Sequence, residues 1–240
     1  DSIPMALIFF GIIMLGSALL GLPFSYYRTF VIEEQYGFNK TSPSTFFSDK
    51  LKGGILTVIL GGGILTLFML FYQSTGPYFW IYAWIAVGIF ILFINLFYSR
   101  LIVPLFNKQT PLEDGSLKSS IENYAQKVGF ELQNIFVIDG SKRSTKANAY
   151  FSGFGKEKRI TLFDTLIQDL SEDEIVAVLA HEVGHYKRNH IIVNLIVSLL
   201  TTGLTLYILS LFINHPEISL AIGVSTPSFH AALVGFALLY

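Results

Sequence analysis

The sequence alternates between long apolar stretches and one polar section near its middle. A helix needs about 20 mainly apolar residues to cross the roughly 30 Å hydrocarbon core of a bilayer. Four stretches meet this requirement: Ile3–Phe24, Gly54–Tyr72, Tyr78–Phe97 and Ile191–Ile213. A fifth, Ile218–Tyr240, is weaker because polar residues and a proline interrupt it. The pattern predicts a multi-span transmembrane helical bundle.

The polar section between the third and fourth spans predicts a small α+β domain. Leu117–Lys127 has the pattern of a short amphipathic helix, ended by Gly129. Asn134–Ile138 is a short apolar run typical of a strand. Lys146–Ser152 and Lys158–Phe163 flank a glycine-rich connection, which indicates a β-hairpin.

A further helix is predicted to begin after Ser171. Ser171 and Glu174 have the spacing of a capping box, and acidic residues fill the first turn. No proline follows before Ile213. The simplest prediction is one long helix that runs from the polar section directly into the fourth span. His185 would then lie about 9 Å along the helix axis from Ile191, at the membrane surface.

Composition and charge support this membrane topology. Hydrophobic residues make up 52% of the chain, mean hydropathy is +0.56, and only 14% of residues are charged, against about a quarter in soluble domains. All 16 Lys and Arg residues lie in the ranges 25–53 and 99–190. The predicted return loops, Gln73–Pro77 and Asn214–Glu217, contain none. Because basic loops favour the cytoplasm, these two ranges are predicted to be cytoplasmic.

The predicted fold is therefore mainly α and divides into three parts. Residues 1–100 form a transmembrane region with three spans and a cytoplasmic loop. Residues 101–190 form a small α+β insert on the cytoplasmic face. Residues 191–240 form a transmembrane region with two further spans.

The insert carries the motif His181-Glu182-Val183-Gly184-His185 on its predicted long helix. Histidines four residues apart share one helix face, where both can bind one zinc ion, and Glu182 can deprotonate the attacking water. The chain has no cysteine, so any metal must be held by histidines and carboxylates. The same motif also occurs by chance on solvated helix faces. The apolar run Ile175–Ala180 directly before it favours a zinc metallopeptidase, since an unpaired polar pair is costly to bury.

Longer sequence blocks make the likeness specific. They are Gly21–Pro23, Thr29–Glu34, Tyr36–Asn39, Ile81–Trp84, Pro104–Phe106, Gly140–Ser144, Asn148–Phe151, Leu162–Leu166 and Ala177–Ala180. With these blocks in this order, nearly the whole chain resembles the type 1 CAAX prenyl protease family. Its members are integral-membrane zinc peptidases that process proteins near an isoprenylated cysteine.

The resemblance implies the roles of the site residues and one zinc ion per chain. The residues concerned are the zinc ligands His181 and His185, the general base Glu182, and the substrate-binding strand residues Asn148, Ala149 and Tyr150. It also implies seven spans around a large intramembrane chamber. The chain departs from the family at both ends: we expect it to lack the N-terminal portion and the downstream helix whose glutamate is the third zinc ligand.

Three other polar residues are weighed against simpler interpretations. Glu217 is the only acid after His185, and it is predicted to lie on the opposite side of the membrane, which makes it a poor ligand. His190 lies about 140° round a continuous helix from His185, so it is predicted to be an interfacial residue rather than a ligand. His230 lies within a span and either lines the chamber or packs in the bundle.

The predicted function is a zinc-dependent endopeptidase that acts near the cytoplasmic membrane surface. Its partners are a peptide or lipidated-protein substrate and membrane lipid, with no nucleic acid and no required oligomer. Lys146-Ala147, where eukaryotic relatives are expected to have His-Ser, favours a bacterial member and the bacterial inner membrane. The endoplasmic reticulum membrane is the alternative for a eukaryotic chain.

Two other functions stay open. One is a quality-control metalloprotease of the HtpX heat-shock type, which is not expected to carry the Tyr36–Asn39 and Ser141–Ser144 blocks. The other is a non-catalytic membrane scaffold, against which the intact Glu182 argues.

Overall fold

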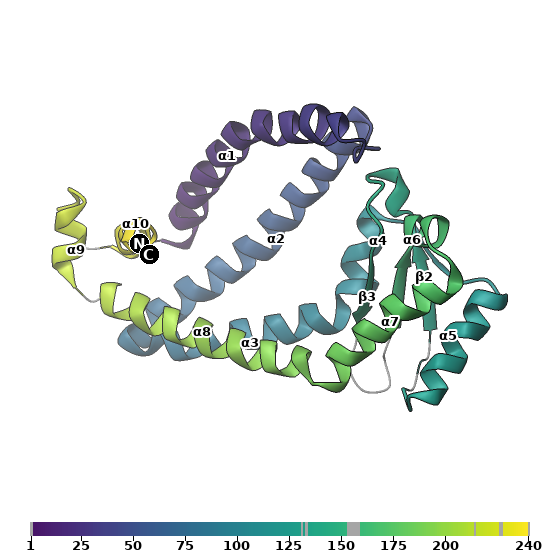
Figure 1. Cartoon of the computed structure of the whole chain (residues 1–240). Coiled ribbons are helices and arrows are strands. Elements are labelled where there is room, and N and C mark those ends of the chain that lie inside the picture. The colour runs from purple at the N-terminus through teal and green to yellow at the C-terminus, as the bar shows by residue number, and fades with distance from the viewer. Residues whose placement is uncertain are drawn as a thin grey trace. The chain divides into compact units, whose positions relative to one another are not determined.

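The computed structural model describes residues 2–130, 132, 134–152, 159–213, 215–225 and 228–239 (Figure 1). The chain divides into two compact units. The helical unit comprises Asp1–Leu20, Gly54–Ile91 and Val193–Tyr240, and the mixed unit comprises Gly21–Gly53 and Leu92–Ile192. The mainly α fold with a small sheet is thus confirmed.

The four strong span predictions each fall within a helix. These helices are α1 (Ile3–Tyr27), α2 (Pro43–Thr75), α3 (Phe79–Phe97) and α8 (His190–Ile213). Three continuous helical stretches in the described residues are long and apolar enough to cross a membrane, and one of them, Pro43–Phe106, contains both α2 and α3. Helix α2 begins well before Gly54 because Ser42 Oγ accepts a bond from the Thr45 N–H and Pro43 occupies the first helical position.

The weaker fifth candidate, Ile218–Tyr240, is not one continuous helix in the described residues. Its residues form two short helices, α9 (Pro216–Ala221) and α10 (Phe229–Leu239). The chain leaves α9 through Gly223, whose φ of 80° lies in the left-handed region that glycine tolerates. Thr226 and Pro227 lie outside the described residues.

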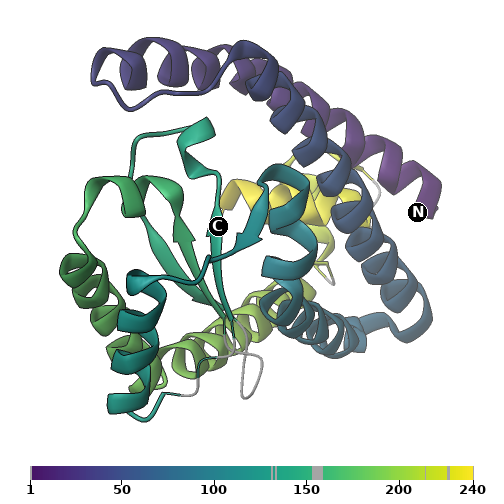
Figure 2. The ribbon, with the colours of Figure 1, turned by 90° about the vertical axis from the view of Figure 1, so that its right-hand side faces the viewer.

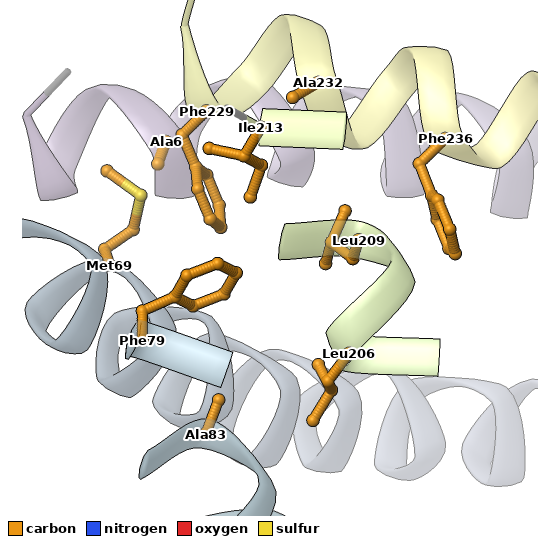
Figure 3. Close-up of a cluster of buried hydrophobic side chains, with 10 residues drawn as sticks. All are labelled: Ala6, Met69, Phe79, Ala83, Leu206, Leu209, Ile213, Phe229, Ala232 and Phe236. Carbon is orange, nitrogen blue, oxygen red and sulfur yellow. The ribbon is translucent and has the colours of Figure 1, made fainter. Parts of the chain in front are cut away.

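Small side chains let the helices of the helical unit pack closely. Figure 3 shows its buried cluster, drawn from α1, α2, α3, α8 and α10: Ala6, Met69, Phe79, Ala83, Leu206, Leu209, Ile213, Phe229, Ala232 and Phe236. At Gly203 of α8, an added Cβ would come 3.0 Å from the Trp84 ring of α3. Trp84 Nε1 also donates a 2.8 Å hydrogen bond to the Leu199 carbonyl. Such packing and polar contacts hold helices together where lipid removes the hydrophobic drive.

The mixed unit is built on a four-stranded sheet of order β1-β2-β4-β3. The strands are β1 (Gln109–Pro111), β2 (Asn134–Ile138), β3 (Ala149–Ser152) and β4 (Arg159–Phe163). The predicted hairpin is confirmed, since β3 pairs antiparallel with β4, although its connection Gly153–Glu157 lies outside the described residues. Strand β2 pairs parallel with the other side of β4, and β1 pairs antiparallel with β2.

Two longer helices, α5 (Ser116–Lys127) and α7 (Glu172–Lys187), pack together beside this sheet (Figure 1, Figure 2). The predicted helix before Gly129 is therefore confirmed. The shorter elements are η1 (Arg28–Glu33), η2 (Gly76–Tyr78), η3 (Tyr98–Ile102), α4 (Val103–Phe106), η4 (Gly140–Lys142) and α6 (Asp164–Asp169). One buried cluster joins both helices to the strands: Ile121, Ile135, Ala149, Ile160, Leu162, Leu166, Ile175 and Leu179.

The prediction of one long helix from Ser171 to Ile213 was wrong. Helix α7 ends at Lys187 and α8 begins at His190. Between them Asn189 has a φ of 56°, the only positive φ of a non-glycine residue in the described part of the chain. Asparagine tolerates this left-handed conformation better than most residues, so it ends α7 and redirects the chain.

Two of the family-like sequence blocks contact each other in the mixed unit. Arg143 pairs with both oxygens of Asp49, through Nε at 2.7 Å and Nη2 at 2.9 Å, and donates to the Phe106 carbonyl at 2.6 Å. The Arg143 carbonyl accepts bonds from the Lys40 N–H and the Thr41 hydroxyl, each at 3.0 Å. These contacts hold the segment that follows η1 against the loop that contains Arg143, within the mixed unit.

Candidate functional site

Helix α7 buries one face and leaves its two motif histidines on the other. Ile175, Leu179 and Val183 are 1–3% exposed and pack into the cores of the mixed unit. Their four-residue spacing defines one helix face, and His181 and His185 lie on a different, exposed one. The burial of the apolar stripe therefore sets the direction of the histidines.

The start of α7 is capped as predicted. The Glu174 carboxylate accepts hydrogen bonds from the Ser171 N–H at 2.8 Å and from its hydroxyl at 2.7 Å. The bond from the Ser171 N–H, and after it the bond from the hydroxyl, holds the pKa of Glu174 below its usual value. A negative charge in the first turn also suits the positive end of the helix.

His181 and His185 meet the distance requirement for one zinc ion. Their Nε2 atoms are 3.0 Å apart, and their ring centroids are 4.6 Å apart. Two tetrahedral ligands with zinc–nitrogen bonds of about 2.1 Å have nitrogens roughly 3.4 Å apart. The observed pair needs only a small ring rotation to reach this separation, so the residues fit the metal.

Glu182 lies beside this pair, half-buried, between the exposed and the buried faces of α7. Within the described residues it makes no hydrogen bond or ion pair, so its carboxylate is available to a substrate or a water molecule. Gly184 keeps the neighbouring surface open, since an added Cβ would meet nothing within 4 Å. No group of three or more His, Cys, Asp or Glu side chains is arranged to hold a metal in the part of the chain that the structure describes.

Strand β3 is an edge strand with its outer side free. Its only partner in the described sheet is β4, because β2 pairs with the far side of β4 rather than with β3. The Phe163 N–H donates to the Asn148 carbonyl, so Asn148 faces β4. Because antiparallel neighbours alternate, Ala149 and Phe151 turn their N–H and C=O groups outward. Among the described residues, the Ala149 N–H donates only to its neighbour's side chain, Asn148 Oδ1, at 2.8 Å.

A cavity of about 250 Å³ runs along this part of β3. It is lined by Tyr150, Phe151 and Ser152 together with Ile94, Asn95, Tyr98 and Ile191. Since consecutive strand residues point to opposite faces, a cavity that touches three in a row lies along the strand edge. Within the part of the chain that the structure describes, the buried hydroxyls of Tyr150 and Ser152 have no hydrogen-bond partner. The cavity thus offers apolar walls and two free polar groups.

The strand and the histidine helix lie next to each other. Ala149 shares a buried cluster with Leu179, two residues before the first histidine. Phe151 contacts the cluster of Val183, and its ring lies 5.3 Å from that of Phe130. The predicted substrate-binding residues, Asn148, Ala149 and Tyr150, are therefore carried on a strand packed against the predicted catalytic helix.

The structure places one further histidine beside the motif. His190 is not separated from the motif, because its Nδ1 lies 2.7 Å from Nδ1 of His185. His230, 9% exposed, stacks on Phe10 and meets Phe9 edge-on, which favours bundle packing over chamber lining. Glu217 pairs with His215 at 3.7 Å on an exposed surface of the helical unit.

Sequence reasoning missed His190 and most of the cavity lining. His190 could have been found from Asn189, a residue that often ends helices in the left-handed conformation. Ile94, Asn95 and Tyr98 were included in or placed next to a predicted span. No pattern in that apolar run distinguishes positions that face the cavity from those that face lipid.

Comparison with known families matches both parts of the chain. Residues 1–108 match the family described as "CAAX prenyl protease N-terminal, five membrane helices". Residues 111–239, more than half of the chain, match "Peptidase family M48". The crystal structure of S. mikatae Ste24p has a TM-score of 0.91 and 39% sequence identity, covering 99% of this chain and 58% of that chain. The predicted membrane bundle with a small metallopeptidase insert is thereby confirmed.

Curated relatives carry one shared name. The CAAX prenyl protease 1 homolog of Arabidopsis thaliana is 51% identical over 179 residues, which are 74% of this chain and 42% of the relative. CAAX prenyl protease 1 of Saccharomyces cerevisiae is 46% identical over 213 residues, 88% of this chain and 46% of the relative. The Homo sapiens CAAX prenyl protease 1 homolog is 35% identical over 277 residues, which cover 99% of this chain and 58% of the relative. The chain spans about half the length of these relatives.

Proposed function

Because the chain belongs to peptidase family M48, we propose that it is a zinc-dependent membrane endopeptidase of the CAAX prenyl protease type. The observation that carries the proposal is the pair of Nε2 atoms of His181 and His185, 3.0 Å apart on the exposed side of α7. Glu182, which has no side-chain partner among the described residues, lies beside them. The edge of β3 that is unpaired in the described sheet lies against the same helix. This is the donor set and the layout that metal-assisted peptide hydrolysis needs.

His181 and His185 would hold one zinc ion through Nε2, as neutral imidazoles. Catalytic zinc sites usually have three protein ligands, and we propose that the third is a carboxylate outside these 240 residues. When bound, zinc supplies a Lewis acid that polarises the scissile carbonyl and makes a nearby water more acidic.

Glu182 supplies the proton chemistry. Its carboxylate takes a proton from the attacking water and then passes that proton to the nitrogen of the leaving amine. Its lack of a partner in the described residues leaves both oxygens free for this transfer. Its half-buried position between the two helix faces keeps it next to the histidines without making it a ligand.

The peptide is held by the outer edge of β3. Ala149 and Phe151 present outward N–H and C=O groups, so an extended peptide can add to the sheet as a further strand. The cavity beside Tyr150 and Ser152 then receives one substrate side chain, with the two hydroxyls as hydrogen-bond partners. Backbone pairing does not depend on side chains, which suits an enzyme that accepts varied sequences.

The catalytic insert faces the cytoplasm in this proposal. All 16 Lys and Arg residues belong to the mixed unit and none to the helical unit. Basic segments stay on the cytoplasmic side of membranes. The chain is an integral membrane protein by its apolar helices. Lys146-Ala147 favours the bacterial inner membrane, and the endoplasmic reticulum membrane is the alternative for a eukaryotic chain.

The substrate is a membrane-associated peptide or lipidated protein. The curated relatives are named for prenylated CAAX substrates, so an isoprenylated peptide should be compared with the same peptide without its lipid. Proteomic comparison of cleaved termini in cells with and without Glu182 would identify natural targets. Membrane lipid is the other partner; no nucleic acid and no oligomer are required.

Two alternatives are separated by specific observations. An HtpX-type quality-control protease is disfavoured by the Tyr36–Asn39 and Ser141–Ser144 blocks, which also contact each other through the bridge of Asn39 with Ser144. A non-catalytic scaffold is disfavoured by the intact Glu182. The proposal is tested by zinc content and peptide turnover of the full-length protein. His181→Ala and His185→Ala should lose most of the zinc and all cleavage; zinc-free protein that still cleaves peptide would disprove it.

A further inference from the structure

The two nitrogens of the His185 ring are both engaged. Nε2 lies 3.0 Å from Nε2 of His181, on the side where zinc is proposed. Nδ1, on the opposite side of the ring, lies 2.7 Å from Nδ1 of His190. The His185 and His190 ring centroids are 4.9 Å apart. His190 therefore contacts a proposed zinc ligand at the ring nitrogen that does not bind the metal.

The helix break creates this contact. On a continuous helix His190 would lie about 140° round the axis from His185 and point elsewhere. Helix α7 instead stops at Lys187, Asn189 turns with a φ of 56°, and α8 restarts at His190. This turn places the half-buried His190 ring next to Nδ1 of His185.

The 2.7 Å distance between Nδ1 of His185 and Nδ1 of His190 indicates which ring nitrogen of His185 carries the proton. Two nitrogens 2.7 Å apart need a hydrogen between them, since two facing lone pairs repel. If Nε2 of His185 gives its lone pair to zinc, the neutral ring carries its proton on Nδ1. That N–H donates to Nδ1 of His190, which in turn keeps its own proton on Nε2.

We propose that His190 is a positioning residue of the zinc site: it accepts the Nδ1–H bond of His185 and thereby fixes the tautomer and ring orientation in which Nε2 of His185 binds the metal. This inference rests on the proposed function and deepens it. Zinc-binding histidines usually donate their other N–H to an acceptor, and removal of that acceptor typically weakens metal binding about 10- to 100-fold. His190 is not proposed as a ligand, because it contacts Nδ1 of His185 and not the Nε2 at which zinc is proposed.

The test measures zinc affinity and needs no turnover. Metal-stripped full-length protein in detergent is titrated with zinc against a chromophoric chelator. His190→Leu removes the acceptor at similar volume and should weaken zinc binding about 10- to 100-fold. His190→Asn places Oδ1 near the position of Nδ1 and should keep the affinity close to wild type. His215→Leu, the same substitution at an exposed histidine of the helical unit, is the matched control and should change nothing.

A second pair of variants tests the helix break. Asn189→Gly keeps the left-handed turn and should keep zinc affinity, whereas Asn189→Val disfavours a φ of 56° and should weaken it as His190→Leu does. Equal affinity of wild type and folded His190→Leu overturns this inference alone. If His190→Asn loses zinc as completely as His190→Leu, His190 does not act as a simple acceptor and the inference is also wrong. A wild-type protein that binds no zinc overturns the proposed function with it.

Discussion

An extended peptide that adds to the free edge of β3 must bond to the outward groups of Ala149 and Phe151. The pairing of Asn148 with Phe163 sets this alternation. On the peptide, every second N–H then faces β3. We therefore consider a cleavable peptide in which single backbone nitrogens, other than that of the scissile amide, are methylated one at a time. We predict that the loss of kcat/KM alternates along the peptide, large at every second position and small at the positions between.

The expected size of the effect follows from the bonds lost. Each methyl group on an inward-facing nitrogen removes one donor and leaves a strand carbonyl unpaired, which costs about 1–3 kcal/mol. At 25 °C this is about a 5- to 150-fold loss in kcat/KM. Methylation of the intervening nitrogens, which point away from β3, should leave kcat/KM near that of the unmodified peptide.

A protein variant provides the reciprocal test. Ala149→Pro removes an N–H that β4 does not use, and its present partner is only Asn148 Oδ1 at 2.8 Å. In the complex a peptide carbonyl would replace Asn148 Oδ1 as the acceptor. The loss of binding free energy in Ala149→Pro should therefore lie near the low end of the 1–3 kcal/mol range, at about 1 kcal/mol or 5-fold in kcat/KM. Zinc content and the unfolding temperature of the zinc-free protein are the folding controls.

The outcome that refutes this reasoning is a flat methylation scan. Equal kinetics of all methylated peptides, or unchanged kinetics of a folded Ala149→Pro protein, would mean that the peptide is held elsewhere. The cavity beside Tyr150 would then need a different occupant.

Three further predictions test the fold, the helix cap and the topology. Gly140→Ala would overlap the Phe163 ring and should destabilise the protein by about 1–3 kcal/mol, measured by thermal unfolding in detergent. In the folded protein the pKa of Glu174 lies below its usual value. The ionised Glu174 therefore stabilises the fold at pH values above that usual value, and this contribution is lost as the pH falls through the folded pKa. Glu174→Gln should flatten this part of the curve of unfolding free energy against pH. Cysteine at Asp114 should react with a membrane-impermeant reagent only from the cytoplasmic side, and cysteine at Ser74 only from the other side; labelling of both from one side contradicts the topology.

The elements that could be predicted are those whose signals are local. The apolar runs of α1, α3 and α8, the amphipathic α5 and the Ser171 cap all depend on residues within a few turns of one another. Strand β2 was predicted with its observed bounds, Asn134–Ile138, because an apolar run between turn residues favours a strand in any context.

The missed elements depend on distant partners or on one residue. Strand β1 is Gln-Thr-Pro, which has no strand pattern; it is a strand only because β2 pairs with it. The parallel pairing of β2 with β4 is likewise tertiary. The break after α7 depends on the single left-handed residue Asn189, which hydrophobic periodicity cannot detect. The predicted position of His190, about 140° round the helix from His185, was wrong for the same reason, since it assumed a continuous helix.

The candidate site shows the same division. The spacing of His181 and His185 and the adjacent Glu182 could be predicted from sequence, because a helix fixes their geometry locally. That β3 is an edge strand lying against α7 required the sheet order.

The most direct test of the central claim is zinc content and peptide cleavage measured on the same preparation of wild-type protein and Glu182→Gln. Because the proposed role of Glu182 is to move the proton and not to hold the metal, the variant should keep one zinc per chain and lose cleavage by about 100- to 10,000-fold. A folded, zinc-loaded Glu182→Gln protein that cleaves peptide at the wild-type rate would contradict the account.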